Sequence, residues 1–474
     1  MTTIRRGISR ILATLLLFAL AGGARAETIR VAIGTQDTTI NCAAGGLLIR
    51  ELHLLDKYLP HTGKYKDARY DVQWKDFTSG APITNEMVAG KLDFGVMADF
   101  PGTLNGAAFE KAGRKSVFIT VLEGSIDGSG NGIVVPVDSP LHSIADLKGK
   151  TISVPFASTS HGMLLRAIKA QGWNPDTDVN IITQAPEVAG SALKAGKIDA
   201  HADFVPFADL FPYRGIARKI YDGAQSHAPT FHGSLVDEAY ARKYPEVVVA
   251  YLRAALEANR LLEQNPEKYS LLIEKVTGIE APVDYLYHGP LGVQTRDFTW
   301  KPEYRQAVAT AIETLRLLKK TDSHLDVNTF VDDRYIREAF KESGLDYEAA
   351  LKNYAKEPLI ANDAATGKPI RDFNDVAQIW LVDEDKVRDY ATPAQAFDAL
   401  RKLGSGAKVR AMYVQNHGTG LKLFADQAWY VKDAKGTVTA FLLKGAADAY
   451  AQRVAGSVVD YAAAKSGSQA VAAR

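Results

Sequence analysis

The sequence predicts an α/β fold of two lobes, followed by a small α+β domain near the C-terminus. Between residues 29 and 202, short stretches with strand alternation take turns with stretches of helical spacing, which indicates parallel sheets covered by helices. One unit of strand, polar loop, helix, strand and second polar loop occurs twice, around residues 70–105 and 150–207. Beyond residue 356, strand patterning returns after a long helical region, which predicts a separate smaller domain.

The two copies of the repeated unit share a short motif. Ala89-Gly-Lys-Leu-Asp-Phe and Ala195-Gly-Lys-Ile-Asp-Ala each mark a helix end, a glycine cap and the entry to a buried strand. Two such units predict two lobes whose polar loops face one another across a cleft, as at the strand ends of α/β sheets.

The elements of the lobes follow from hydrophobic periodicity. The predicted strands are 29–33, 70–74, 92–97, 117–122, 132–135, 151–154, 179–182 and 198–202. The predicted helices are 42–59, 84–89, 161–171, 186–195, 247–262 and 304–318. The bilobal region is predicted over 27–357, with the second lobe at about 123–228.

The C-terminal part begins with a polar segment rich in Pro, Gly and Asn at 358–373, which is typical of a linker. The domain at 374–474 has the size of an ordinary small domain. Its predicted strands are 376–381, 409–415, 428–432 and 438–443, and its predicted helices are 393–402 and 446–455. The Ala- and Ser-rich tail from 465 onward is expected to fray.

The first 26 residues have the pattern of a secretory signal peptide. Arg5, Arg6 and Arg10 form a basic start, an apolar run covers 11–21, and Ala24-Arg-Ala26 fits a cleavage site. The apolar run is too short to span a bilayer. No Cys follows it directly, so we expect a Sec-exported periplasmic protein, cleaved after Ala26, rather than a lipoprotein.

Composition excludes several classes of function. Lys and Arg total 56 and Asp and Glu total 55, so the net charge of +1 argues against nucleic-acid binding and polybasic membrane attachment. Cys42 is the single cysteine, so no intramolecular disulfide forms, which fits a periplasm. We expect Cys42 to be a small buried residue rather than a thiol that reacts or binds metal.

Two loops of small polar residues are the candidate ligand contacts. Thr78-Ser-Gly80 precedes a helix start near Pro82, and Ser158-Thr-Ser160 precedes the next lobe's helix. Such starts present unpaired backbone N–H groups that attract an anionic or hydrogen-bond-accepting ligand. No nucleophile–base pair accompanies either loop, so the sequence indicates capture rather than catalysis, and no cofactor is expected.

Four ordered motifs carry a resemblance to a known family. They are Phe77-Thr-Ser-Gly-Ala-Pro with the first glycine-capped copy, Ile133-Val-Val-Pro-Val-Asp-Ser-Pro, Val154-Pro-Phe-Ala-Ser-Thr-Ser-His-Gly, and Asp203-Phe-Val-Pro-Phe after the second copy. With these motifs the first 350 residues resemble the sulfonate/nitrate/taurine solute-binding proteins of ABC importers (SsuA/TauA-like). The resemblance implies a periplasmic binding protein type II fold, whose two lobes close on a small molecule.

The same resemblance implies a monomer that is not an enzyme and that delivers its solute to an inner-membrane permease. It also implies the following ligand-binding residues: Gln36, Asp37, Thr39, Thr78, Ser79, Gly80, Asp99, Phe100, Ser158, Thr159, Ser160, His161, Asp203 and Phe204.

The acidic residues of these loops leave alternatives open. Asp37, Asp99, Asp127 and Asp203, with His161 and other imidazoles nearby, could hold a metal or metal chelate, or a cationic thiamine-precursor pyrimidine. Together with helix starts that attract anions, they also fit a solute with an anionic end and a cationic or donor end, such as an aminosulfonate. An enzyme of the thiamine-pyrimidine synthase type would need a dense His and Cys set, and the chain has one Cys.

The C-terminal domain resembles, more loosely, the periplasmic copper-delivery protein NosL. The matching residues are Thr392-Pro-Ala-Gln-Ala-Phe, Ala411-Met-Tyr-Val-Gln-Asn and Asp426-Gln-Ala-Trp-Tyr-Val. The Cys-containing copper segment of that family is absent. Met412 and His417 remain weak candidates for metal ligands, and an exposed loop His and a core Met are the simpler interpretation.

Overall fold

The computed structural model describes residues 27–317, 323–355, 359–404 and 406–467. The proposed signal peptide therefore lies outside the described residues. Within the described residues, no helix has both the length and the apolar character needed to cross a membrane.

The first lobe is built on a five-stranded sheet in the order β2-β1-β3-β10-β4. Its strands are β1 (Thr28–Thr35), β2 (Arg69–Asp76), β3 (Phe94–Ala98), β4 (Ser116–Ser125) and β10 (Thr230–Asp237). The second lobe has a five-stranded sheet in the order β7-β6-β8-β5-β9. Its strands are β5 (Gly132–Pro136), β6 (Thr151–Val154), β7 (Asn180–Thr183), β8 (Ala200–Asp203) and β9 (Ala217–Asp222).

Both sheets are mixed, so the expectation of parallel sheets was wrong for one strand of each, β10 and β5. β10 runs antiparallel to β3 and β4, and β5 runs antiparallel to β8 and β9. The physical reason is the connection between lobes. The chain crosses from β4 of the first lobe to β5 of the second, and crosses back from β9 to β10 of the first lobe. The strand that follows each crossing therefore enters its sheet in the opposite direction.

The two crossings lie in backbone contact and form a hinge of residues 126–131 and 223–229. The Gly223 amide donates to the Asn131 carbonyl oxygen at 2.8 Å. A Cβ at Gly223 would lie 2.1 Å from the Gly128 carbonyl oxygen, and Gly128 itself has φ +96°. Only glycine permits this approach, so the sequence makes the two segments pack as one narrow connection.

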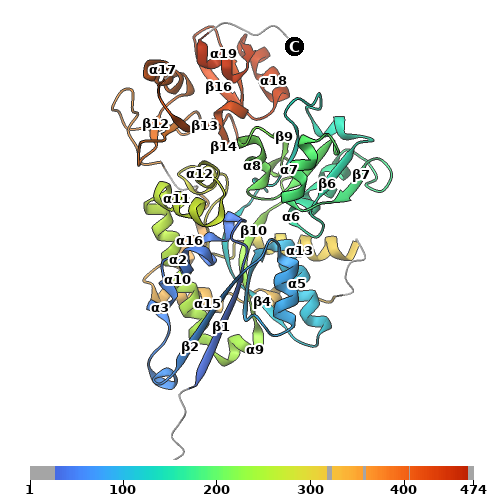
Figure 1. Ribbon diagram of the computed structural model, residues 1–474, viewed down its shortest axis with the longest axis vertical. Helices are drawn as coiled ribbons and strands as arrows, with labels where there is room; N and C mark the ends of the chain where they lie inside the picture. The colour runs from blue at the N-terminus through green and yellow to red at the C-terminus, as the bar shows by residue number, and fades with distance from the viewer. Residues whose placement is uncertain (1–26, 318–322, 356–358, 405, 468–474) are drawn as a thin grey trace, which may run out of the picture.

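Helices cover both sheets (Figure 1). The helices up to β10 are α2 (Leu47–Glu51), α3 (Leu54–Tyr58), α4 (Gly80–Val88), α5 (Asp99–Lys111), α6 (Thr159–Ala170), α7 (Pro186–Lys194) and α8 (Phe207–Tyr213). The later ones are α9 (Glu238–Lys243), α10 (Pro245–Gln264), α11 (Pro266–Thr277), α12 (Ala281–His288), α13 (Pro302–Leu317), α14 (Val327–Phe330), α15 (Arg334–Glu342) and α16 (Tyr347–Lys352). Short 3₁₀ turns are η1 (Ile40–Gly45), η2 (Gly63–Tyr65), η3 (Ile144–Leu147) and η4 (Gly223–Ser226).

The long helix α10 illustrates how the sequence fixes a core helix. Pro245 opens it at a position where its missing N–H costs nothing. Val248, Tyr251 and Leu252 follow at helical spacing and are fully buried. The Tyr251 hydroxyl donates to the Gly45 carbonyl oxygen at 2.7 Å, which ties the helix to the start of the first lobe.

The C-terminal region forms a seven-stranded sheet, with the order β12-β11-β13-β16-β15-β17 and β14 paired to β13. Its strands are β11 (Ala377–Leu381), β12 (Arg388–Tyr390), β13 (Val409–Asn416), β14 (Leu421–Phe424), β15 (Trp429–Lys432), β16 (Val438–Phe441) and β17 (Ser457–Val459). Its helices are α17 (Pro393–Leu403), α18 (Lys444–Val454) and α19 (Tyr461–Ser466), with the turn η5 (Ala425–Gln427). The predicted fold class, two α/β lobes and a small α+β region, is confirmed.

Two local expectations were wrong. The helix predicted over 42–59 is divided into η1, α2 and α3, because Gly45 and Gly46 interrupt it and His53 adopts a left-handed conformation with φ 51°. The second polar loop of the first repeated unit, expected after the strand at 92–97, is the first turn of α5, where the Asp99 side chain accepts a hydrogen bond from the Phe100 amide.

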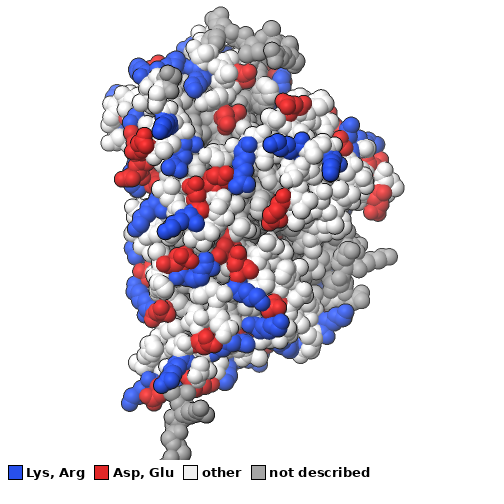
Figure 2. Space-filling model, viewed as in Figure 1, with Lys and Arg blue, Asp and Glu red and all other residues white. Residues whose placement is uncertain are grey.

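The exact division of the chain into domains stays a prediction. Leu359 and Ile370, within the proposed linker, are buried beside Leu291 and Val376, so this segment packs along the molecule. On the face in Figure 2, positive and negative side chains are interspersed, in agreement with the near-zero net charge.

Candidate functional site

A cavity of about 200 Å³ lies between the two lobes. Its lining comes from the ends of β1 and β3 and the start of α4 in the first lobe, and from the starts of α6 and α7 in the second. Eight of the residues implied by the resemblance line it: Gln36, Thr39, Thr78, Ser79, Gly80, Ser158, Thr159 and Phe204. The structure thus brings these residues together, and their contact with a ligand stays a prediction.

The start of α4 forms one wall of this cavity. Ser79 precedes the helix in an extended conformation. A Cβ at Gly80 would lie 2.7 Å from Cβ of Pro101, so a glycine lets the first turn of α4 approach the first turn of α5. The first backbone N–H groups of α4 have no partner within the helix and lie at the cavity wall.

The start of α6 forms the opposite wall. The Ser158 hydroxyl accepts a hydrogen bond from the His161 amide at 3.2 Å and donates to the Pro155 carbonyl oxygen at 2.6 Å. Ser158 therefore acts as a helix cap, as its sequence position indicates. The first turn of α6 begins at Thr159, and its backbone N–H groups have no acceptor within the helix, so they can donate to a ligand at this wall.

A buried hydroxyl of the first lobe completes the polar lining. Thr39 is only 1% exposed, and its Oγ1 has no hydrogen-bond partner within the described part of the chain. A buried hydroxyl without a partner carries a desolvation cost of about 1–3 kcal/mol. A ligand atom in the cavity would remove that cost, so Thr39 is an independent indication of a binding site.

The cavity carries little charge. Glu187, in the first turn of α7, is the one Asp, Glu, Lys or Arg among the described residues that line it. His232 also lines the cavity, and burial lowers its pKa to about 3, so its imidazole is neutral. Any anionic group would therefore be held by N–H groups and hydroxyls rather than by a side-chain cation.

Six of the implied residues do not line the cavity. Asp37 faces Arg50, whose guanidinium lies 2.9 Å from its carboxylate. Asp203 is fully buried and hydrogen-bonds to the His201 ring at 2.7 Å, and burial raises its pKa. Phe100 packs against α13, Ser160 is buried beside Ser158, and the His161 ring stacks on Phe156 at 4.7 Å.

Asp99 is the sixth of these residues and connects α5 with β10. Burial raises its pKa to about 7, although the Phe100 amide, the Thr230 hydroxyl and the charge of Arg166 favour the carboxylate. Because Arg166 lies on α6, this electrostatic interaction links the two lobes.

The metal-binding alternatives receive no geometric support from the described residues. Among them, no group of three or more His, Cys, Asp or Glu side chains is arranged to hold a metal ion. Met412 is buried in β13 at 5% exposure, and His417 lies 3.3 Å from Asp375. Cys42 is buried, and burial raises the pKa of its thiol.

Several lining residues were missed from the sequence, chiefly Phe156, Gln184 and Glu187. The signal for Glu187 was present, because Pro186-Glu187 opens a helix directly after a strand, just as the other two site loops do. His232 is one of the imidazoles near the acidic loops, but its position in the cavity was not predicted, since it enters from β10 after the chain has crossed the hinge.

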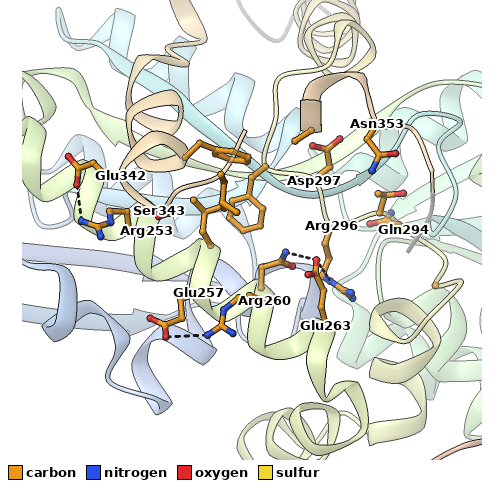
Figure 3. A pocket seen from close by; sticks show the side chains of 18 of the residues that line it. Arg253, Glu257, Arg260, Glu263, Gln294, Arg296, Asp297, Glu342, Ser343 and Asn353 are labelled. Carbon is orange, nitrogen blue, oxygen red and sulfur yellow. Dashed lines mark hydrogen bonds and ion pairs between the residues drawn. The ribbon is translucent and has the colours of Figure 1, made fainter. Parts of the chain in front are cut away.

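A second cavity of about 800 Å³ is bounded by α10, the segment 289–298 and α15 (Figure 3). Its charges compensate one another, because Arg253 pairs with Glu342 at 2.8 Å and Lys57 with Glu257 at 2.8 Å. We favour the smaller cavity, because it lies between the lobes, the starts of α4 and α6 converge on it, and eight of the residues implied by the resemblance line it.

Comparisons with known proteins identify a matching family model and related sequences. A family model described as NMT1/THI5 like matches residues 60–269. A putative aliphatic sulfonates-binding protein of Escherichia coli is 29% identical over 276 residues, covering 58% of this chain and 79% of that protein. The taurine-binding periplasmic protein of E. coli is 29% identical over 203 residues, covering 43% of this chain and 61% of that protein.

Solved structures show the same fold. The periplasmic aliphatic sulphonate binding protein SsuA from E. coli matches with a TM-score of 0.52 and 25% identity, covering 65% of this chain and 97% of that one. The alkanesulfonate-binding protein SsuA from Xanthomonas axonopodis pv. citri, bound to MOPS, matches with a TM-score of 0.54 and 22% identity, covering 65% and 100%. The resemblance to sulfonate- and taurine-binding proteins is thereby confirmed, and the NosL resemblance stays a prediction.

Proposed function

We propose that the chain is the periplasmic solute-binding component of an ABC importer. In this proposal it is exported by the signal peptide at 1–26 and acts as a monomer. It captures a small organic anion or zwitterion of the sulfonate, taurine and nitrate class, and delivers the solute to a membrane permease. The relatives and the shared fold support the class of protein.

One observation carries the choice of ligand chemistry. The starts of α4 and α6 meet at one cavity, together with the unpaired hydroxyl of Thr39. Helix N-termini carry partial positive charge and free N–H groups, which favour an anionic ligand group without a counter-cation in the protein. A sulfonate, with three acceptor oxygens, matches several donors that converge from both lobes.

Binding without catalysis is part of the proposal. The described residues that line the cavity include no Cys, and their one His is buried and neutral. A pyrimidine of the thiamine pathway is the second candidate ligand, because the matching family model is THI5 like and Glu187 could accept hydrogen bonds from a cationic ring.

The proposal is tested by placing a negative charge at the start of α4. Ala81 lines the cavity and is exposed in the second position of the helix. Ala81→Glu keeps the helix stable, because an acidic residue is favourable in a first turn, but it repels an anionic ligand. Calorimetric titration with ethanesulfonate should show binding that Ala81→Glu weakens at least about tenfold, or about 1.4 kcal/mol, and that Ala81→Gln largely keeps.

The same titration includes nitrate, a thiamine-type aminopyrimidine and zinc and copper salts. Binding of the pyrimidine alone would move the proposal to its second candidate. Tight binding of a bare metal ion, or sulfonate binding that Ala81→Glu leaves unchanged, would refute it.

A further inference from the structure

The first inference concerns Glu187 and rests on the proposed function. We infer that Glu187 makes the cavity select solutes that carry a cationic end as well as an anionic end, over simple anions of the same size. Glu187 would therefore determine specificity within the class of small organic anions.

The charges around the cavity are distributed unequally. The starts of α4 and α6 offer backbone N–H groups, whereas the start of α7 adds two side-chain acceptors, the Glu187 carboxylate and the Gln184 amide oxygen. Glu187 has no ion-pair partner within the described part of the chain, although surface carboxylates elsewhere in the molecule are commonly paired. Oε1 of Gln184, beside it in sequence, is a buried acceptor that likewise lacks a partner among the described residues.

A bare anion and the Glu187 carboxylate would repel one another in a small cavity. Burial is the main cause of the raised pKa of the Asp203 carboxyl group, and the negative charge of Glu187 raises it further. An ammonium group near Glu187 and Gln184 would offset this excess of negative potential and donate to both acceptors. Glu187 also lies in the first turn of α7, where a negative charge interacts favourably with the helix dipole.

The test uses two solutes that differ in one ammonium group. Taurine and ethanesulfonate share the sulfonate and the two-carbon chain, and both are titrated into the intact chain and into Glu187→Gln. The intact chain should bind taurine at least about tenfold more tightly than ethanesulfonate. In Glu187→Gln this preference should disappear through weaker taurine binding, with ethanesulfonate binding unchanged or tighter. Glu313→Gln, on the exposed side of α13, is the matched control.

Three results would overturn the inference. They are equal affinity of the intact chain for both solutes, an equal loss of both in Glu187→Gln, and a preference that survives the substitution. If neither solute binds the intact chain, the proposed function itself fails, which is a different outcome from a missing preference.

A second inference rests on the contacts of the C-terminal region and does not depend on the ligand. We propose that this region is a brace that limits the relative motion of the two lobes. It contacts α8 of the second lobe, where the Tyr213 ring lies 5.0 Å from that of Phe424 and its hydroxyl donates to the Arg410 carbonyl oxygen at 3.3 Å.

The same region also holds α11 and α12. The Tyr413 hydroxyl donates to the Pro282 carbonyl oxygen at 2.9 Å, and the Tyr285 ring packs between Trp380 and Tyr413 at 5.3 and 5.4 Å. On α11, the Glu267 carboxylate lies 3.0 Å from the Lys386 ammonium. Figure 1 shows α8 and α12 below the C-terminal sheet.

α12 in turn is fixed to the first lobe. The His288 ring hydrogen-bonds to Glu123 of β4 at 2.8 Å, whereas the neighbouring Tyr287 donates to Asp209 of α8. If the lobes open so that α8 moves away from α12, the contacts of Tyr213 with the C-terminal region must therefore also break. A chain with this brace would change its shape less on binding than one with free lobes.

Distance measurements between spin labels test the brace. Lys111→Cys and Lys197→Cys place labels on exposed positions of the first and second lobes, and the natural Cys42 is buried. The ligand-free chain should give a narrow distance distribution, and Tyr213→Ala or Phe424→Ala should broaden it or shift it to longer distances. Tyr461→Ala, on α19, whose ring packs on Phe397 within the C-terminal region, is the control in the same region. A distribution unchanged in both folded brace variants would overturn the proposal.

Discussion

The buried His288 cluster yields a prediction with a defined dependence on pH. Its ring lies 2.9 Å from Asp284 and 2.8 Å from Glu123, and all three side chains are at most 2% exposed. The Ser270 hydroxyl donates to Asp284 at 2.7 Å, so the cluster joins α11, α12 and β4. His288→Gln would leave two buried carboxylates without a cation, and we expect a loss of about 3–5 kcal/mol in the free energy of unfolding near neutral pH.

The pKa of His288 determines how the free energy of unfolding changes with pH. Burial disfavours the imidazolium, but the two carboxylates outweigh it and raise the pKa from 6.5 to about 10. The folded state thus holds a proton that the unfolded state releases above pH 6.5. The stabilisation is fully present below that pH and is lost as the pH rises toward about 10, by about 1.4 kcal/mol per pH unit.

The assay compares the intact chain with a neutral version of the cluster, His288→Gln with Asp284→Asn and Glu123→Gln. Urea unfolding followed by tryptophan fluorescence reports on this region, because Trp380 packs on Tyr285 of α12. From about pH 7 to about pH 9 the stability of the intact chain should fall by about 2.7 kcal/mol relative to that variant. A constant difference across this range would refute the assignment of a charged His288.

Three further predictions concern other parts of the molecule. Gly223→Ala should destabilise the chain by more than about 1 kcal/mol in urea unfolding, because its Cβ would meet the Gly128 carbonyl oxygen at 2.1 Å. The stability of the intact chain relative to Asp99→Asn should fall as the pH rises from about 4 to about 7, since burial raises the pKa of Asp99 to about 7 and folding favours its neutral form. Cys42 should react with a thiol reagent only after denaturant is added, because it is buried and burial raises its pKa.

The architecture was predictable because its signals are local. Gly90 and Gly196, in the two copies of the repeated motif, both have positive φ, at 72° and 64°, and both follow the end of a helix. Most strands and helices of the C-terminal region were also predicted within two residues, as for α17 after Thr392, whose side chain caps the helix. Caps and alternation need only neighbouring residues, so one sequence is enough to reveal them.

The site was less predictable, because the fold decides which acidic side chains are paired with another residue and which face the cavity. Asp37 is paired by Arg50, and Asp203 by His201, so neither faces the cavity. From the sequence alone both carboxylates were candidates for contact with a cationic ligand or a metal. Among the described residues that line the cavity, Glu187 is the one Asp, Glu, Lys or Arg, and only the assembled cavity distinguishes it from an ordinary residue of a helix start.

The place of β10 was not predictable for a similar reason. Every residue of β10 is buried, so the strand lacks the alternation of buried and exposed side chains that reveals a half-buried strand in a sequence. The strand exists because the chain returns across the hinge and completes the first sheet between β3 and β4. His232 reaches the cavity through this long-range pairing.

Calorimetric titration of taurine into the chain without residues 1–26, beside its Ala81→Glu and Ala81→Gln variants, tests the central claim most directly. The account predicts saturable binding of one taurine per chain, weakened at least about tenfold by the glutamate and retained with the glutamine. No heat of binding for taurine, ethanesulfonate or nitrate, or an affinity that the added negative charge leaves unchanged, would contradict the claim that the helix starts between the lobes hold an anionic group.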